Sequence, residues 1–265
     1  MASRELMVVQ QLQARGISDP RVLAAMRKVP RHELIPEENR GDAYGDHPVP
    51  IGEGQTISQP LIVAYMTECL ELKGTEKVLE VGTGSGYQAA ILGELAGEVY
   101  TIEIVPSLAK RAAADLTRLG YANVHVREGD GYRGWAEEAP FDGIIITAAP
   151  PRIPQPLLDQ LAVGGRLVVP VGIDVQQLVR ITRTETGFNE ERLVPVRFVP
   201  MTGEIQNRKG VRHRFASNAK RCLTPFQTLR MYSKSRGWPL MPRSGAAIQF
   251  AILPRSRTGS ISSLT

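Results

Sequence analysis

Short apolar runs alternate with amphipathic stretches along most of this chain, a pattern typical of strands that alternate with helices. The run from Phe141 to Thr147 is apolar enough for a central strand that is buried on both faces. Residues 41–56, in contrast, are rich in glycine and proline and predict a long irregular segment. Helices are predicted over residues 5–15, 20–28, 60–70, 87–96, 106–119 and 157–161, and strands over residues 77–81, 99–103, 123–126, 141–147, 164–170, 177–182 and 193–198. These repeated units predict an α/β fold: a doubly wound, mostly parallel seven-stranded sheet with helices on both faces, closed by a β-hairpin.

The most informative motif follows the first predicted strand, where Val78-Leu79-Glu80-Val81 leads into Gly82-Thr83-Gly84-Ser85-Gly86. Glycines permit positive φ angles and leave the wall of a turn free of side chains, so a ligand can lie against the backbone and the start of the next helix. The dinucleotide fingerprint places its third glycine one residue later, at the position of Tyr87. A glycine turn beside the carboxylate of Glu80 instead suits the ammonium and carboxylate of S-adenosylmethionine. Taken alone, the motif is equally compatible with an ordinary tight turn.

Two further acidic residues follow at the spacing that a nucleoside pocket needs. Glu103 ends the second predicted strand about twenty residues after the glycine turn, where its carboxylate can accept both ribose hydroxyls of an adenosine. Asp130 lies in a Gly-Asp-Gly turn after the third predicted strand, where it can accept from the adenine amino group. The predicted cofactor-binding residues are therefore Glu80, Gly82, Thr83, Gly84, Ser85, Gly86, Glu103, Asp130 and Gly131.

Length and composition set the wider bounds. A chain of 265 residues with 42 % hydrophobic content can bury one full α/β domain. No apolar run approaches the ~20 residues that cross a bilayer, and the amino end lacks the pattern of a secretory signal. The cysteines, Cys69 and Cys222, are too few for a disulfide framework, and the four histidines show no ligand spacing with them. We therefore expect a cytoplasmic monomer with no structural metal and no membrane partner.

The charge of the chain is divided unevenly. Residues 208–265 contain twelve Lys or Arg and no Asp or Glu, which leaves 20 basic and 27 acidic residues before them. Four prolines break this segment, and it ends in Ser/Thr-rich sequence. We predict one catalytic domain at residues 1–207 and a basic, poorly ordered C-terminal extension at residues 208–265. Such an extension either binds nucleic acid or another anionic surface, or has no dedicated partner.

With these motifs, the chain resembles the protein-L-isoaspartate O-methyltransferases over residues 7–201. That family belongs to the class I S-adenosylmethionine-dependent methyltransferases, which share the glycine turn widely, so the turn indicates only the superfamily and its Rossmann-like fold. A second motif, Gly54-Gln55-Thr56-Ile57-Ser58-Gln59-Pro60, is more specific than the glycine turn and indicates the family. The similarity also covers residues 129–131, 141–149, 161–170 and 197–200, but not the extension after Asn207.

The resemblance implies that Ser58 is the active-site residue. The α-carboxylate of an isoaspartyl residue is ionised near pH 7, since its pKa is ~3.5, and its methylation requires no strong general base. The reaction needs a site that orients this carboxylate about 3 Å from the methyl donor. The hydroxyls of Thr56 and Ser58 can donate to the carboxylate without a full positive charge that would weaken the nucleophile. Without the family, Ser58 is equally well explained as a cap, with Gln59 as the other candidate, of a helix that begins at Pro60.

Other methyltransferase classes lack their motifs here. Enzymes that methylate amide or exocyclic amino nitrogens typically carry Asn/Asp-Pro-Pro-aromatic after the fourth strand, where this chain has Thr147-Ala148-Ala149-Pro150-Pro151. Carbon-5 pyrimidine methylation needs a cysteine nucleophile, and neither cysteine stands near a turn of the predicted pocket. We expect methylation of L-isoaspartyl and, more weakly, D-aspartyl residues in damaged proteins and peptides. The alternatives are a nucleic-acid methyltransferase that uses the basic extension and a methyltransferase-like binding module without turnover.

Overall fold

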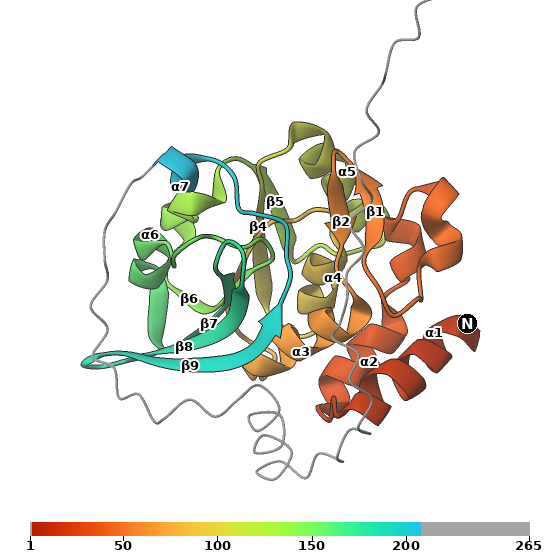
Figure 1. Ribbon diagram of the computed structural model, residues 1–265, viewed down its shortest axis with the longest axis horizontal. Coiled ribbons are helices and arrows are strands. Elements are labelled where there is room, and N and C mark those ends of the chain that lie inside the picture. The colour runs from red at the N-terminus through yellow and green to blue at the C-terminus, as the bar shows by residue number, and fades with distance from the viewer. Residues whose placement is uncertain (1, 208–265) are drawn as a thin grey trace, which may run out of the picture.

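The computed structural model describes residues 2–207, in which a twisted seven-stranded sheet forms the centre of the molecule (Figure 1). The strand order is β5-β4-β3-β6-β7-β8-β9. All pairs from β5 to β7 are parallel, whereas β8 pairs antiparallel with both β7 and β9. The strands are β3 (Lys77–Val81), β4 (Glu98–Glu103), β5 (Val124–Glu128), β6 (Phe141–Ile146), β7 (Leu161–Val171), β8 (Gln176–Thr184) and β9 (Gly187–Val196). The predicted α/β fold with its closing hairpin is confirmed, and the predicted extension lies outside the described residues.

Helices cover both faces of this sheet, as the alternation of side chains along β3 shows. Val78 packs into one core cluster with residues of α2 (Pro20–Lys28), α3 (Pro60–Leu70) and α4 (Tyr87–Gly93). Leu79 points to the opposite face, into a cluster with residues of α6 (Gln155–Asp159). Helix α5 (Pro106–Arg118) is long and amphipathic, and it packs into the first cluster through Leu108 and Leu116. Both faces of β3 are buried, and its residues are apolar apart from the half-buried Lys77 at its start and the buried Glu80.

The order of the strands places a crevice at the carboxyl end of β3. From β3 the chain moves outward to β4 and β5, and then returns to the other side of β3 to form β6 and β7. Ligands of open α/β sheets bind at such switch points, outside the carboxyl ends of the strands. The glycine turn follows β3 directly, so the topology brings it to this crevice.

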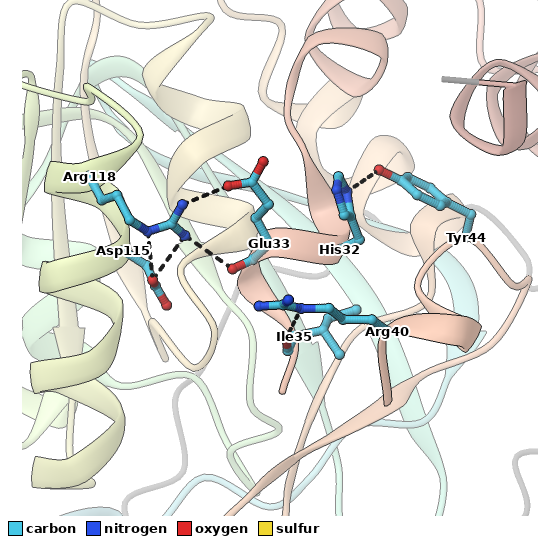
Figure 2. Close-up of polar contacts among 7 residues, drawn as sticks. All are labelled: His32, Glu33, Ile35, Arg40, Tyr44, Asp115 and Arg118. Atoms are coloured by element: carbon cyan, nitrogen blue, oxygen red, sulfur yellow. Dashed lines mark hydrogen bonds and ion pairs between the residues drawn. The ribbon is translucent and has the colours of Figure 1, made fainter. Parts of the chain in front are cut away.

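An N-terminal layer lies beside the sheet and contacts α5. It contains α1 (Ala2–Leu6), the short turns η3 (Arg31–Leu34) and η4 (Glu37–Asp42), and a hairpin of β1 (Val49–Gly52) and β2 (Gln55–Ile57). Figure 2 shows the polar contacts that two residues of η3, His32 and Glu33, make with Tyr44 and with α5. Arg118 of α5 donates to the Glu33 carboxylate at 2.6 Å and also to Asp115, while the His32 ring bonds the Tyr44 hydroxyl at 2.8 Å. The exposed ion pairs of Arg118 each contribute only about 0–1 kcal/mol.

The expectation of an irregular segment over residues 41–56 was wrong in its second half. There the chain forms the antiparallel hairpin of β1 and β2, with Val49 opposite Ile57. Its tip is tight, because Gly52, Glu53 and Gly54 all have positive φ angles. The strands are short and one contains Pro50, so the amino-acid composition does not indicate them. The residues of β1 nevertheless alternate between buried and exposed.

Element ends differ from the predicted ones for local reasons. The predicted helix 5–15 is irregular: after α1, a wider turn spans Met7–Leu12 and a 3₁₀ turn spans Gln13–Arg15 before Gly16 ends the helix in a left-handed conformation. Strand β9 begins at Gly187 rather than at residue 193, because it is an edge strand whose first half is polar and half-exposed. The last short elements are η5 (Gly131–Arg133), η6 (Ala136–Glu138) and α7 (Glu204–Asn207).

Candidate active site

A pocket opens at the carboxyl ends of β3, β4 and β6, at the switch point of the sheet. Its atom-free space, including the open mouth, is about 950 Å³. The pocket brings together residues from the hairpin, the glycine turn and two strand ends. The predicted site residues that line it are Thr56, Ser58, Glu80, Gly82, Thr83, Gly84, Ser85, Glu103 and Gly131.

The glycine turn forms a bare wall of this pocket. Gly82, Gly84 and Gly86 have φ angles of 102°, 53° and 82°, which other residues adopt only with strain. The Gly82 amide donates to the Ile102 carbonyl at 2.8 Å, and the Thr147 hydroxyl donates to the Gly82 carbonyl at 2.6 Å. A Cβ at Gly82 would lie 2.4 Å from the Thr147 hydroxyl oxygen. The turn is therefore clamped between β4 and β6 and leaves backbone, not side chains, for a ligand.

Glu103 stands at the end of β4 and holds two of the loops that surround the pocket. Its Oε2 accepts from the Gly84 amide at 2.7 Å, and its Oε1 accepts from the Val105 amide at 2.9 Å. A carboxylate offers about four acceptor positions, so two remain for ligand hydroxyls. Glu103 thus ties the glycine turn to the loop before α5, a role that its position in the sequence did not predict.

Glu80 is a completely buried acid in the pocket wall. Its Oε2 accepts from the Thr101 hydroxyl at 2.6 Å, but its Oε1 has no hydrogen-bond partner among the described residues. Burial raises the pKa of Glu80 to about 8; the Thr101 hydrogen bond opposes this shift, and the negative charge of Glu103 adds to it. A buried acceptor without a partner fits a ligand that brings a positive charge or a donor. The ammonium of S-adenosylmethionine meets that requirement.

The raised pKa of Glu80 predicts a pH dependence of stability. Between the pKa of an unfolded glutamate, about 4.3, and the folded value of about 8, the native state binds more protons than the unfolded state. The free energy of unfolding of the ligand-free protein should therefore fall as pH rises through this window. Glu80→Gln should remove that part of the fall, which urea unfolding at pH 6 and pH 9 would measure. Glu98→Gln, at an exposed position, is the control, and equal pH dependence in wild type and Glu80→Gln would contradict the assignment.

Thr56 and Ser58 approach the pocket from the hairpin side. Thr56 is exposed in β2, and Ser58 is half-buried in the loop between β2 and α3. The N-cap of α3 is Gln59, whose side chain makes no capping bond and donates instead to the Asp46 carbonyl and carboxylate. No hydrogen bond joins the Ser58 hydroxyl to another residue of the described chain. The explanation of Ser58 as a helix cap is therefore not supported, and its hydroxyl is available to a ligand.

Two predicted cofactor residues lie outside the lining of this pocket. Gly86 caps α4 and packs under Leu116, which lies 3.3 Å from the position a Cβ would take. The Asp130 carboxylate accepts from the Tyr132 amide at 2.9 Å and from the Glu204 amide at 2.7 Å, so it joins the turn after β5 to α7. The adenine contact of Asp130 stays a prediction. Gly131 does line the pocket, and a Cβ there would lie 2.3 Å from Val81, which explains the glycine.

The structure adds residues that the sequence patterns did not indicate. The segment from Phe198 to Thr202 crosses the open end of the sheet and lines the pocket. It is held there by two backbone bonds of Ala149, which donates to Val199 and accepts from Met201, both at 2.8 Å. This segment is neither a regular strand nor a helix, so no periodicity marks it. The similarity of residues 197–200 to the family was the available signal.

Within residues 2–207, no three His, Cys, Asp or Glu side chains come together in a way that could hold a metal ion. In the same part of the chain, every helix is too short or too polar to cross a membrane.

A family model described as protein-L-isoaspartate(D-aspartate) O-methyltransferase matches residues 3–206. The chain belongs to this family. Members of the family use S-adenosylmethionine, in agreement with the glycine turn and the acids around it. Among curated relatives, the protein-L-isoaspartate O-methyltransferase of Gloeobacter violaceus is 59 % identical over 200 residues, which are 75 % of this chain and 98 % of the relative. That of Picosynechococcus sp. is 56 % identical over 203 residues, 77 % of this chain and 91 % of the relative.

Solved structures of the family agree with the fold. A protein-L-isoaspartate O-methyltransferase superposes with a TM-score of 0.69 at 27 % identity, covering 76 % of this chain and 67 % of its own. A second, from Plasmodium falciparum and in complex with S-adenosyl-L-homocysteine, gives a TM-score of 0.65 at 29 % identity, covering 74 % of this chain and 96 % of its own. The predicted family, fold class and cofactor are thus confirmed.

Proposed function

We propose that this protein methylates the α-carboxylate of L-isoaspartyl residues, and more weakly of D-aspartyl residues, in damaged proteins and peptides. The observation that carries the proposal is one pocket that joins a cofactor wall to a free hydroxyl. Glu80, Glu103 and the glycine turn form the wall, and Ser58, whose hydroxyl has no partner in the described chain, lines the same space. The membership in the family supports this arrangement as a methyltransferase site.

S-adenosylmethionine, when bound, supplies an electrophilic methyl group on its sulfonium. The residues of the chain bind the cofactor and the acceptor peptide and orient them. The backbone of the glycine turn would hold the methionine end, Glu80 would provide an acceptor for its ammonium, and Glu103 would offer its remaining acceptor positions to the ribose hydroxyls. Ser58 and Thr56 then donate to the oxygens of the acceptor carboxylate, which keeps it in line with the methyl group. No residue has to remove a proton, since the carboxylate is already ionised.

The methyl ester makes repair possible without further help from the enzyme. The amide nitrogen of the following residue attacks the ester carbonyl, loses its proton and expels methanol, which closes a succinimide. Water opens the succinimide to a mixture of normal and isoaspartyl linkages, and repeated cycles convert the second into the first. Because damage arises in many sequences, recognition must rest on the backbone, and flexible peptides should be better substrates than buried sites.

Methyl acceptance by two substrates separates the proposal from its alternatives. With radiolabelled S-adenosylmethionine, the full-length protein should transfer label over many turnovers to a synthetic isoaspartyl peptide and not to RNA. Label on RNA with none on the peptide would identify a nucleic-acid methyltransferase. Cofactor binding without transfer to either would identify a binding module.

We further propose that residues 1–207 form the catalytic domain of a cytoplasmic monomer. The family match ends at residue 206, which supports this boundary. A chain that ends at Asn207 should then retain peptide methylation. The full-length protein alone should bind polyanions, with an affinity that falls with log salt by ~0.7–0.9 per phosphate contacted. Loss of peptide methylation on truncation, with unchanged thermal melting, would show instead that the extension belongs to the active site.

A further inference from the structure

Arg31, in η3, is a charged side chain that is completely buried beside the active site. Its exposed fraction is 0 %, and it is among the largest fully buried side chains of the described residues. Its Nε donates to the Ala43 carbonyl at 2.7 Å, and one terminal nitrogen donates to the Ser58 carbonyl at 2.8 Å. Its guanidinium carbon lies 4.7 Å from the centre of the Tyr87 ring. A single guanidinium therefore contacts three segments that are far apart in the sequence.

This arrangement is costly for the fold alone. The second terminal nitrogen of Arg31 is buried without a hydrogen-bond partner in the described chain, and the guanidinium contacts two backbone carbonyls and a tyrosine ring. Burial lowers the pKa of Arg31 to about 10, but the group stays protonated near neutral pH. Burying a charge that is not paired with an opposite charge costs free energy, which two hydrogen bonds to carbonyls offset only in part. A role beyond packing would account for an arginine at this position.

The contact with Ser58 has a direct consequence for the proposed active site. The Ser58 carbonyl precedes the N-cap of α3, so no backbone amide of that helix bonds it, and Arg31 supplies its donor. Fixing this carbonyl restrains the peptide plane after Ser58 and with it the backbone position from which the Ser58 side chain projects. On the other side of the same plane, the Gln59 side chain is held by Asp46.

The backbone from which Arg31 projects is itself held. The next two residues, His32 and Glu33, bond Tyr44 and Arg118, as Figure 2 shows. On the far side, the Tyr87 ring that Arg31 contacts belongs to the first residue of α4, directly after the last glycine of the turn. Arg31 thus bridges the loop that carries the proposed acceptor-binding hydroxyl and the helix that begins at the cofactor wall.

We propose that Arg31 is a positioning residue: its guanidinium fork holds the Ser58 peptide against the start of α4 and so aims the Ser58 hydroxyl at the acceptor carboxylate. The proposal rests on the function proposed above for Ser58. It assigns to Arg31 an effect on kcat with the isoaspartyl peptide, and little effect on the affinity for S-adenosylmethionine.

A double-mutant cycle tests this inference with the full-length protein. Arg31→Met, which keeps the volume but loses the fork, should lower kcat with the isoaspartyl peptide about tenfold to 100-fold, as expected for a misaligned reacting group. In a Ser58→Ala background, the same substitution should change kcat less than about twofold, because the two residues act through one hydroxyl. Arg31→Lys keeps the charge without the planar fork and should remain impaired. The dissociation constant for S-adenosylmethionine should change less than about threefold throughout.

Leu158→Ala controls for loss of stability, since Leu158 is buried in α6 on the other face of the sheet and does not line the pocket. At a temperature at which all variants are folded, it should leave kcat unchanged. Equal loss of kcat from Arg31→Met with and without Ser58, or full activity in Arg31→Lys, would overturn the positioning role while wild-type methylation stands. Absence of methylation in the wild type would overturn the proposed function and this inference together.

Discussion

Replacement of Ser58 by alanine is expected to lower kcat on an isoaspartyl peptide about 100-fold while the affinity for S-adenosylmethionine stays within about twofold of wild type. Ser58 lines the pocket and its hydroxyl has no partner in the described chain, so removal of the hydroxyl takes away the proposed donor to the acceptor carboxylate and leaves no group of the described chain without a partner. Turnover measured by methyl release, and cofactor binding measured by calorimetry, would check both halves of this expectation.

Ser58→Thr is the matched variant, because it keeps the hydroxyl and adds one methyl group. It should retain most of the turnover that Ser58→Ala loses. If cofactor affinity falls in parallel with the rate in Ser58→Ala, the side chain supports the pocket structurally and does not act on the acceptor.

Glu103→Ala is expected to raise the dissociation constant for S-adenosylmethionine by about tenfold to 100-fold. Hydrogen bonds to a carboxylate contribute about 1.5–3 kcal/mol each, and a tenfold change in affinity corresponds to about 1.4 kcal/mol. The substitution also leaves the amides of Gly84 and Val105 without their acceptor, which should loosen the glycine turn and lower the melting temperature modestly. Calorimetric titration with the cofactor measures the first effect, and thermal unfolding measures the second.

Glu98→Ala provides the control for this experiment. Glu98 lies at the other end of the same strand, where its half-exposed carboxylate bonds His125 far from the pocket lining. It should leave cofactor affinity unchanged. Equal affinities in wild type and Glu103→Ala would mean that the ribose lies elsewhere.

The parts of the fold that the sequence predicted are those in which a local rule and the tertiary structure agree. Strand β3 is apolar at three of its five positions because both its faces are buried. The turn after it needs glycines because these residues have positive φ angles and because Thr147 fills the space of a side chain at Gly82. The approximate positions of Glu80 and Glu103 follow from these two elements. Strand β9 lies at an edge of the sheet, and because its first half is polar, the sequence pattern did not show where the strand begins.

The remainder depends on contacts between distant segments, which periodicity does not record. Asp130 follows the expected strand, yet its carboxylate bonds the Glu204 amide, 74 residues later in the chain. Arg31 is an ordinary basic residue in the sequence, and only the fold shows that its guanidinium is buried between Ser58 and Tyr87. The segment from Phe198 to Thr202 reaches the pocket because it crosses the end of the sheet beside Ala149.

Single-turnover methyl transfer to a synthetic isoaspartyl peptide, compared with its normal aspartyl twin, tests the central claim most directly. The two peptides share composition and charge and differ only in the linkage that the pocket is proposed to recognise. We expect rapid labelling of the isoaspartyl peptide, as a methyl ester of its α-carboxylate, and no labelling of the twin above background. Equal labelling of the two peptides would contradict the central claim.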